Sequence, residues 1–221
     1  CNQHITSHFA KKNIFCKFGK TQWMRELWEY GNLRISPASY YSGSEHNIAR
    51  RDDELVLETY VTPYDYDLGI IPEFLLDKCP ERGWSVIRHV KPSNHYLYCL
   101  TGSFNPRYFF DFRGDGSIAD ACVIIHKPDE FEERLAAAVR QALEGWRVTT
   151  GMAKYVDPYF IVTLLSGHSD EIFFFKPFRF LYQKEYRLIA IPPPGQQGVL
   201  DHLSLKLGSL KDIAELVCVT S

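Results

Sequence analysis

The strongest candidate for chemistry is the tetrapeptide Lys184-Glu185-Tyr186-Arg187, late in the chain. Three of its four residues can carry a charge, although the flanking residues are aromatic and aliphatic. A carboxylate on a partly buried strand face needs a cationic partner or a role, because burial disfavours its charged form. Arg187 lies two residues after Glu185, so both side chains share one face of a strand. The sequence therefore predicts that Glu185 is either half of an exposed ion pair or a carboxylate positioned at a cleft.

A second group of polar residues lies near the N-terminus. Lys17 interrupts the apolar run Phe15–Phe18, and the next predicted strand carries or precedes Ser36, Ser39, Tyr40 and Tyr41. Tyrosines and serines close to a cation suit a flat aromatic ligand that bears phosphates. The alternative is that Lys17 occupies the solvent face of a half-buried strand and that the tyrosines pack on the core.

Two further segments could contribute to a site. Arg50 and Arg51 form a basic pair that could hold a diphosphate, and the acidic residues Asp52, Asp53 and Glu54 follow them. The alternative for this charged run is a solvated helix face. The segment Ser103–Arg113, which contains Phe104, is aromatic and lies between two predicted strands. Such a loop is a candidate lid or binding loop.

Several enzyme classes lack their usual sequence motifs. The chain contains no HExxH, no GxSxG, no GxxxxGK[ST] and no glycine-rich dinucleotide fingerprint. None of the six cysteines forms a CxxC pair with another, and most lie in apolar runs. We therefore predict buried free thiols, no bound metal and no disulfide.

The elements that must position these residues mix strands and helices without regular βαβ alternation. Strands are predicted at Asn13–Phe18, Asn32–Ser36, Tyr96–Thr101, Ala121–His126, Phe180–Ile191 and Val199–Leu207. Helices are predicted at Gln22–Tyr30 with Thr21 as N-cap, Phe131–Trp146 and Ser209–Leu216, with shorter ones at Pro72–Lys78 and Asp170–Phe175. Pro63–Leu68 reads as a loop. This order predicts an α+β fold, a single domain over residues 1–221 with a mixed or antiparallel β core and short peripheral helices.

Composition limits the classes of function. Hydrophobic residues make up 45% of the chain and charged residues 24%, enough for a core without metal or disulfide staples. The net charge of −2 gives no support for binding of a nucleic-acid backbone as the main activity. We expect a cytoplasmic protein without a membrane span, because the apolar runs are short and no secretory signal is present. Residues 1–12 are polar and are expected to be flexible or processed, and the missing initiator methionine suggests a fragment of a longer chain.

Four stretches, in order, resemble a bacterial family of unknown function. They are Phe15–Gly19, Leu33–Pro37, Tyr98–Ser103 and Lys184–Leu188, which match its aromatic-Lys-Phe start, its "LRFSP"-like and "Cys-Phe-Ser"-like strands and its late "Glu-Tyr-Arg" strand. The chain departs from that family at Tyr41–Glu45, where an Asn-Asp-Pro-like turn is expected.

The order of elements also resembles the ADP-ribosyltransferase fold. Lys17, the helix Gln22–Tyr30, Ser36 with Tyr40, and Glu185 follow the order of that fold's first strand, helix, second strand and late-strand glutamate. The resemblance implies that NAD is the substrate and that Glu185 stabilises an oxocarbenium-like transition state. The sequence departs from the pattern at Lys17, where arginine or histidine is usual, and it has no Ser-Thr-Ser triplet.

Three functions remain open. The first is NAD-dependent ADP-ribosyl transfer, or NAD glycohydrolysis, by a toxin or defence effector that acts on a protein or nucleic acid and has a cognate inhibitor. Its catalytic residue is Glu185, and its binding residues are Lys17, Ser36, Ser39, Tyr40, Tyr41, Arg50, Arg51, Phe104 and Arg187. The second is a non-catalytic module that binds a nucleotide or a partner. The third is a nuclease with a metal held by Asp52, Asp53, Glu54 and Glu185. We also predict that Lys17 and Glu185 approach one cleft from neighbouring strands.

Overall fold

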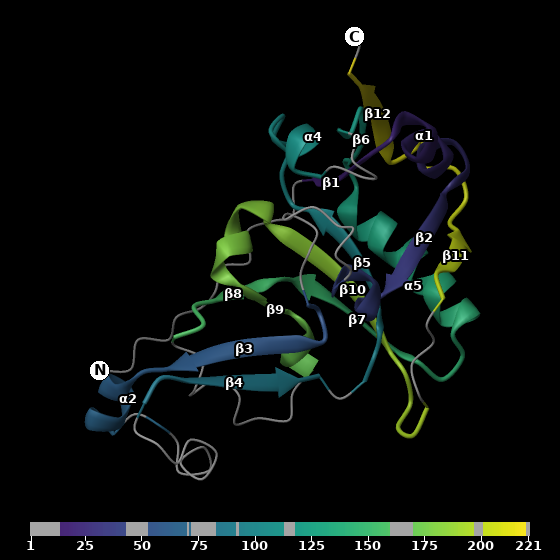
Figure 1. Cartoon of the computed structure of the whole chain (residues 1–221). Coiled ribbons are helices and arrows are strands. Elements are labelled where there is room, and N and C mark those ends of the chain that lie inside the picture. Colours follow the sequence, from purple (N-terminus) through teal and green to yellow (C-terminus); the bar gives the residue numbers. More distant parts are fainter. Residues whose placement is uncertain are drawn as a thin grey trace, which may run out of the picture.

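An eight-stranded sheet lies at the centre of the protein, which we describe from a computed structural model (Figure 1). The description covers residues 14–42, 53–69, 71, 83–91, 93–112, 118–159, 170–196 and 201–219. The sheet is built from β1 (Phe15–Gly19), β2 (Asn32–Pro37), β5 (Tyr96–Thr101), β6 (Ala121–Ile125), β7 (Arg147–Met152), β10 (Glu185–Ile191), β11 (Leu203–Lys206) and β12 (Ala214–Cys218). Its neighbouring strands pair antiparallel in the order β11-β2-β5-β1-β6-β12, with β10 pairing β5 and β7 pairing β10. The predicted α+β class is confirmed.

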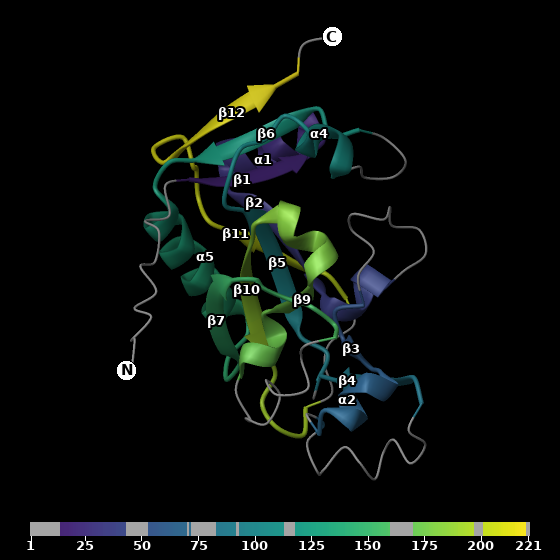
Figure 2. The same ribbon diagram turned by 90° about the vertical axis from the view of Figure 1, so that its left-hand side faces the viewer.

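The central strand β5 is shared by two parts of this sheet. Along one edge it pairs with β10 over its whole length, from Tyr96 opposite Ala190 to Thr101 opposite Glu185. Two different strands use the other edge: β2 pairs at Tyr96 and Leu97, and β1 pairs at Thr101. The strands β1 and β2 therefore diverge along β5, and Figures 1 and 2 show them running in different directions. We call the opening between them the split.

Two helices cover one face of the sheet. They are α1 (Thr21–Tyr30) and α5 (Pro128–Ala142), and Figure 2 shows α5 alongside β7 and β10. Their buried side chains join those of the strands in the main apolar core, which includes Phe15, Leu27, Tyr98, Phe131, Leu135, Tyr186 and Leu188. The helix α1 ends at Gly31, as predicted, because the positive φ of 69° there suits glycine. At its start the prediction was wrong: Thr21 is the first helical residue, and Asp120 accepts hydrogen bonds from its N–H and its hydroxyl.

A separate two-stranded sheet extends from this body, at the lower left of Figure 1. It consists of β3 (Val56–Val61) and β4 (Ser85–Val90), and α2 (Pro63–Asp67) follows β3. We call these elements the β3–β4 arm. The helix α2 contradicts the predicted loop Pro63–Leu68, and a capping box between Thr62 and Asp65 explains why a helix begins there. The predicted helix Pro72–Lys78 lies outside the described residues.

Short elements complete the fold. The strands β8 (Lys154–Val156) and β9 (Phe175–Pro177) form a parallel pair, and α4 (Tyr108–Asp111) lies within the aromatic segment after β5. Three 3₁₀ helices are present among the described residues: η1 (Ala38–Ser42), η3 (Asp170–Phe173) and η4 (Phe178–Gln183). None of the helices in the described part of the chain is long and apolar enough to cross a bilayer.

Two predicted elements near the C-terminus differ from the structure, one in its first residues and the other in type. The predicted strand Phe180–Ile191 begins as η4 and becomes β10 only at Glu185, because Lys184 has a left-handed backbone with φ of 44°. The predicted helix Ser209–Leu216 is instead a turn followed by β12. Its residues Leu210, Ile213 and Ala214 are buried at a spacing that resembles a helix, but the chain there gains strand pairing with β6.

Candidate functional site

Glu185 is the first residue of β10 and lies between two cations. Its Oε1 accepts a hydrogen bond from Arg187 Nε at 2.7 Å, and its Oε2 accepts one from Lys176 Nζ at 2.6 Å. Its backbone N–H donates to the Tyr155 hydroxyl at 2.8 Å. The same-face pairing of Glu185 with Arg187 was predicted, but the pair is buried rather than exposed, since only 5% of Glu185 and none of Arg187 is accessible.

A second carboxylate completes this arrangement from outside the main sheet. Glu54, just before β3, receives two hydrogen bonds from the Arg187 guanidinium, at 2.9 and 2.8 Å. Lys91, just after β4, lies 3.6 Å from Glu54, and Lys176 lies 3.7 Å from it. We call Glu54, Lys91, Lys176, Glu185 and Arg187 the buried ion cluster, because each is at most 5% exposed. The cluster also fastens the base of the β3–β4 arm to β10.

The cluster keeps its carboxylates ionised. Burial by itself raises the pKa of Glu185, but Arg187 and Lys176, with a hydrogen bond from Cys99, hold that pKa far below its ordinary value. The pKa of Glu54 is also lowered: burial opposes ionisation, and Arg187, Lys176 and Lys91 outweigh it. Glu185 is therefore a fixed negative charge at neutral pH, not a proton donor.

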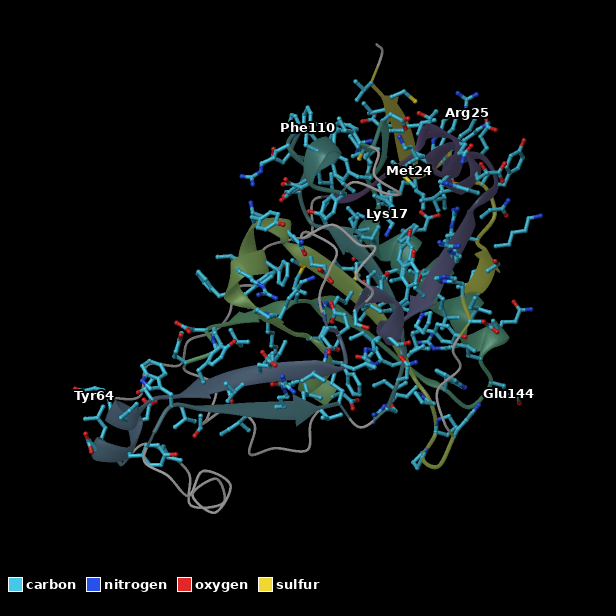
Figure 3. The ribbon with its side chains drawn as sticks, viewed as in Figure 1. Lys17, Met24, Arg25, Tyr64, Phe110 and Glu144 are labelled. Atoms are coloured by element: carbon cyan, nitrogen blue, oxygen red, sulfur yellow. The ribbon has the colours of Figure 1, made fainter. Side chains whose placement is uncertain are left out.

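A cavity of about 1100 Å³ opens at the split in the sheet, and both Lys17 and Glu185 line it. Both residues thus line one cavity, but the predicted approach from neighbouring strands is wrong, because β1 and β10 each pair with β5 and not with one another. The two side chains lie on opposite faces of the sheet, Lys17 beside Tyr98 and Glu185 beside Arg187. Lys17 Nζ donates to the Cys99 carbonyl at 2.7 Å and lies 4.3 Å from the centre of the Tyr98 ring. Figure 3 shows Lys17 and Met24 below α1, where β1 and β2 diverge. Tyr98 and Cys99, whose side chains face opposite sides of β5, both line the cavity.

Hydroxyl and aromatic groups from β2 and η1 form another wall of the cavity. Ser36, Tyr40 and Tyr41, which were predicted to bind a ligand, all line it. The Ser36 hydroxyl lies 3.0 Å from Nδ1 of His202, and the rings of Tyr40 and Tyr41 meet edge to face. Burial, and after it the nearby Cys99, raises the pKa of Tyr41, so its hydroxyl stays protonated.

Three other predicted binding residues do not line this cavity. Ser39 is instead bonded to Asn94 through its N–H and its hydroxyl, at 3.2 and 3.0 Å. Phe104 stacks on Phe18 in an aromatic cluster at the surface. Arg187 has no accessible surface and does not line the cavity, but its guanidinium holds Glu54 and Glu185 in place. The basic pair, Arg50 and Arg51, lies outside the described residues.

Lys176, Lys91 and Tyr98 belong to the site or support it but were not predicted from the sequence. Lys176 follows the apolar run Ile172–Phe175, so it carried the same signal that had singled out Lys17, a single cation in an apolar run. Lys91 and Tyr98 carried no comparable signal, because only the folded chain brings Lys91 to Glu54 and Tyr98 to Lys17.

The predicted metal ligands are differently disposed. Asp53 is exposed and its carboxylate accepts a hydrogen bond from the Leu55 N–H at 3.0 Å, while Glu54 and Glu185 are held by cations. Among the described residues, no group of three or more histidines, cysteines or acids is placed to hold a metal ion. Asp52 lies outside the described residues.

The geometry of the site is not accompanied by a similarity of the chain to a known protein. Comparisons of the chain with protein-family models, with curated proteins and with solved structures found no match. What the site does must therefore be inferred from its own geometry.

Proposed function

We propose that the chain binds NAD in the cavity at the split and cleaves the bond between nicotinamide and ribose, giving ADP-ribosyl transfer or hydrolysis. The observation that carries this proposal is that an ionised, buried glutamate lines the same cavity as a lysine and two tyrosines. The cavity volume, about 1100 Å³, slightly exceeds the range of roughly 300–1000 Å³ that is usual for small-molecule sites. A dinucleotide is a ligand of suitable size.

The residues suit the charges that develop in this reaction. Cleavage passes through a ribose that resembles an oxocarbenium ion, and a fixed carboxylate such as Glu185 stabilises that positive charge. Lys17 is a cation for the diphosphate, and Tyr40 and Tyr41 offer rings for stacking. The departing nicotinamide leaves with the bonding electron pair, and an acceptor hydroxyl or water attacks the ribose and loses its proton.

A second candidate function is supported by one specific contact. Both oxygens of Glu185 already accept hydrogen bonds from cations, Arg187 and Lys176. These cations reduce the charge that Glu185 can offer to an oxocarbenium ion. This observation favours a module that binds a nucleotide in the same cavity without cleaving it.

As an enzyme, the protein would be an effector of toxin or defence type that acts on a macromolecular acceptor.

The experiment that separates the two functions is incubation of the protein with NAD labelled in its adenosine part. Nicotinamide release and transfer of label to lysate components are followed together, and NAD binding is measured by calorimetry. Under the enzymatic proposal, Glu185→Gln lowers turnover by about 10²-fold or more per folded molecule. Binding without any turnover supports the module instead.

A matched variant controls for stability. Glu54→Gln removes the same charge from the same buried cluster, so both variants lose stability for the same reason. Rates are compared at equal folded fraction, measured by circular dichroism. If the two variants lose activity equally, Glu185 has no specific role in the reaction and the catalytic assignment is wrong.

A further inference from the structure

The partly exposed 3₁₀ helix η4 leads directly to Glu185, which lines the cavity. In the 3₁₀ helix η4, Phe180 and Gln183 are buried, whereas Phe178 and Leu181 are 55% and 44% exposed. Three-residue spacing places Phe178 and Leu181 in one row on the outer side of this helix, and the exposed Lys184 follows at its end. Glu185 follows at once and turns inward to the cavity.

Lys184 has an unusual backbone at this junction. Its φ of 44° is the single positive value at a non-glycine position among the described residues. A bulky residue in the left-handed region is uncommon and costs energy, and such residues cluster at functional sites. Here the conformation ends η4, exposes the Lys184 side chain and starts β10 with its carboxylate inside.

The neighbouring segment around α4 adds rings and a further cation to this outer surface. Tyr108 donates a hydrogen bond from its hydroxyl to the Tyr182 carbonyl, which ties α4 to η4. Arg107 is largely exposed and lies 5.6 Å from the centre of the Tyr182 ring. Phe104 is 38% exposed, and its ring stacks on that of the buried Phe18. Figure 3 shows Phe110 of α4 on the outside of the same region.

The charges on this surface are mainly positive. Arg107, Arg179 and Lys184 are exposed, and Asp111 is the acid paired with Arg107, at 3.0 Å. We call Phe104, Arg107, Phe178, Arg179, Leu181 and Lys184 the η4–α4 surface. It adjoins the cavity, because Phe18, Phe112 and Gln183, which lie beside it, line the cavity.

We propose that the η4–α4 surface binds single-stranded nucleic acid and presents it to the cavity at Glu185. Exposed rings provide stacking for unpaired bases, and the interleaved cations provide contacts to the phosphates. An acidic protein segment would use the cations alone and leave the rings without a purpose, and a duplex would offer no unstacked base to them. That the bound nucleic acid is the acceptor of ADP-ribose rests on the proposed NAD-dependent function. That the η4–α4 surface binds nucleic acid does not depend on that function.

The test is fluorescence anisotropy with labelled single-stranded RNA and DNA of about 12 nucleotides, a length chosen from known site sizes of about 4–16 nucleotides. Phe178→Ala is expected to weaken binding by about 5- to 100-fold, as loss of one stacked base predicts. Arg179→Gln is expected to reduce the slope of log affinity against log salt by about 0.7. Lys184→Asn removes a charge with a residue that tolerates the left-handed backbone, so the fold is kept and binding weakens.

The matched controls lie elsewhere on the surface. Tyr64→Ala removes an exposed ring from the β3–β4 arm, and Arg140→Gln removes an exposed cation from α5. Both are expected to leave binding unchanged. Absence of single-strand binding, equal loss in the control variants, or equally tight binding of duplex DNA or polyglutamate would each overturn the proposal.

Binding is measured first without NAD and then with it, so the two proposals can fail separately. If the nucleic acid binds but receives no ADP-ribose, and free NAD is not consumed either, the proposed function is wrong and the surface assignment stands. If NAD is consumed but no strand binds, the surface assignment is wrong and the proposed function stands.

Discussion

The two faces of β5 and β10 differ sharply around Glu185 and Arg187, although farther along the same face Leu97, Ile189 and Ile191 are buried in a smaller apolar cluster. On the helix-covered face, Tyr98, Tyr186 and Leu188 join a large apolar core with Phe15 and Leu135. On the opposite face, the same strands bear Cys99, Glu185 and Arg187, and the last two belong to the buried ion cluster. The strands are identical in backbone and pairing, so the contrast comes from alternate side chains alone.

This contrast separates side chains whose burial stabilises the fold from side chains whose burial costs free energy. Each apolar side chain that is fully buried stabilises the fold by about 1.5–3 kcal/mol. Buried charges instead lose their hydration, and even good ion pairs often fail to repay that loss. Five such charges gathered beside a cavity are thus a poor way to stabilise a sheet and a good way to hold a carboxylate in one position. Three changes test this comparison, in order of decreasing effect.

The largest effect is expected from Arg187→Met. The substitution leaves Glu54 and Glu185 buried without their shared guanidinium, so the free energy of unfolding should fall by about 3–5 kcal/mol. Leu188→Met, one residue along but on the apolar face, conserves volume and should cost less than about 1.5 kcal/mol. Urea unfolding measures both. Equal losses would show that the two faces do not differ in the way proposed.

An intermediate effect is expected from pH, through His95 at the edge of the ion cluster. Burial, then the nearby Lys91, lowers the pKa of His95 to about 4, with Glu54 opposing and Arg187 assisting. The unfolded chain therefore binds the proton more tightly than the folded protein, and stability falls as pH falls from about 6.5 to about 4. The loss amounts to roughly 3 kcal/mol, since one pKa unit corresponds to about 1.4 kcal/mol.

The variant His95→Gln isolates this contribution. It should show a flatter dependence of the urea midpoint on pH between about 6.5 and 4.5. Below that range both proteins should lose stability, because the lowered pKa values of Glu54 and Glu185 make the folded state release protons that the unfolded state binds. An unchanged slope in the variant would mean that His95 is not the titrating group.

The smallest effect separates two tyrosines on the apolar face of β5. The Tyr96 hydroxyl donates to the Asp201 carbonyl at 2.9 Å, so Tyr96→Phe should cost about 1 kcal/mol. The Tyr98 hydroxyl is buried without a hydrogen-bond partner in the described part of the chain, so Tyr98→Phe should be neutral or stabilising by up to about 1 kcal/mol. Thermal unfolding of both variants decides, and equal destabilisation would show that Tyr98 has a bonding partner after all.

Much of the sheet could be predicted from local pattern. The strands β1, β2, β5 and β6 and the helices α1 and α5 fall within a few residues of the predicted ranges, because each has a strong apolar period or a clear end signal. The failures came where tertiary contacts outweigh local preference. In the predicted helix Ser209–Leu216, for example, pairing with β6 converts the last residues to a strand.

The site was predictable only in part. Glu185 and Lys17 stood out because a charge in an apolar run is unusual, and both line the cavity. The partners of Glu185 were less visible: Glu54 lies 133 positions from Arg187 in sequence, and nothing local connects them. Burial itself was also hidden, because the pairing of Glu185 with Arg187 looks the same in sequence whether water reaches it or not.

The base of the β3–β4 arm has an evolutionary consequence. The Lys91 N–H donates to the Leu55 carbonyl at 2.8 Å, and Val56 lies opposite Val90, so the chain leaves and returns at almost the same point. Antiparallel neighbours of this kind can be joined by a turn of about two residues. The segment beyond the paired residues Val61 and Ser85 can thus be lengthened, shortened or exchanged while Glu54 and Lys91 remain where they are. The start of β3 is less free to change, because Leu57 packs with Val156 and Phe175. We expect related proteins to differ most in the length of the segment between β3 and β4 and least in Glu54 and Lys91, which flank the β3–β4 arm.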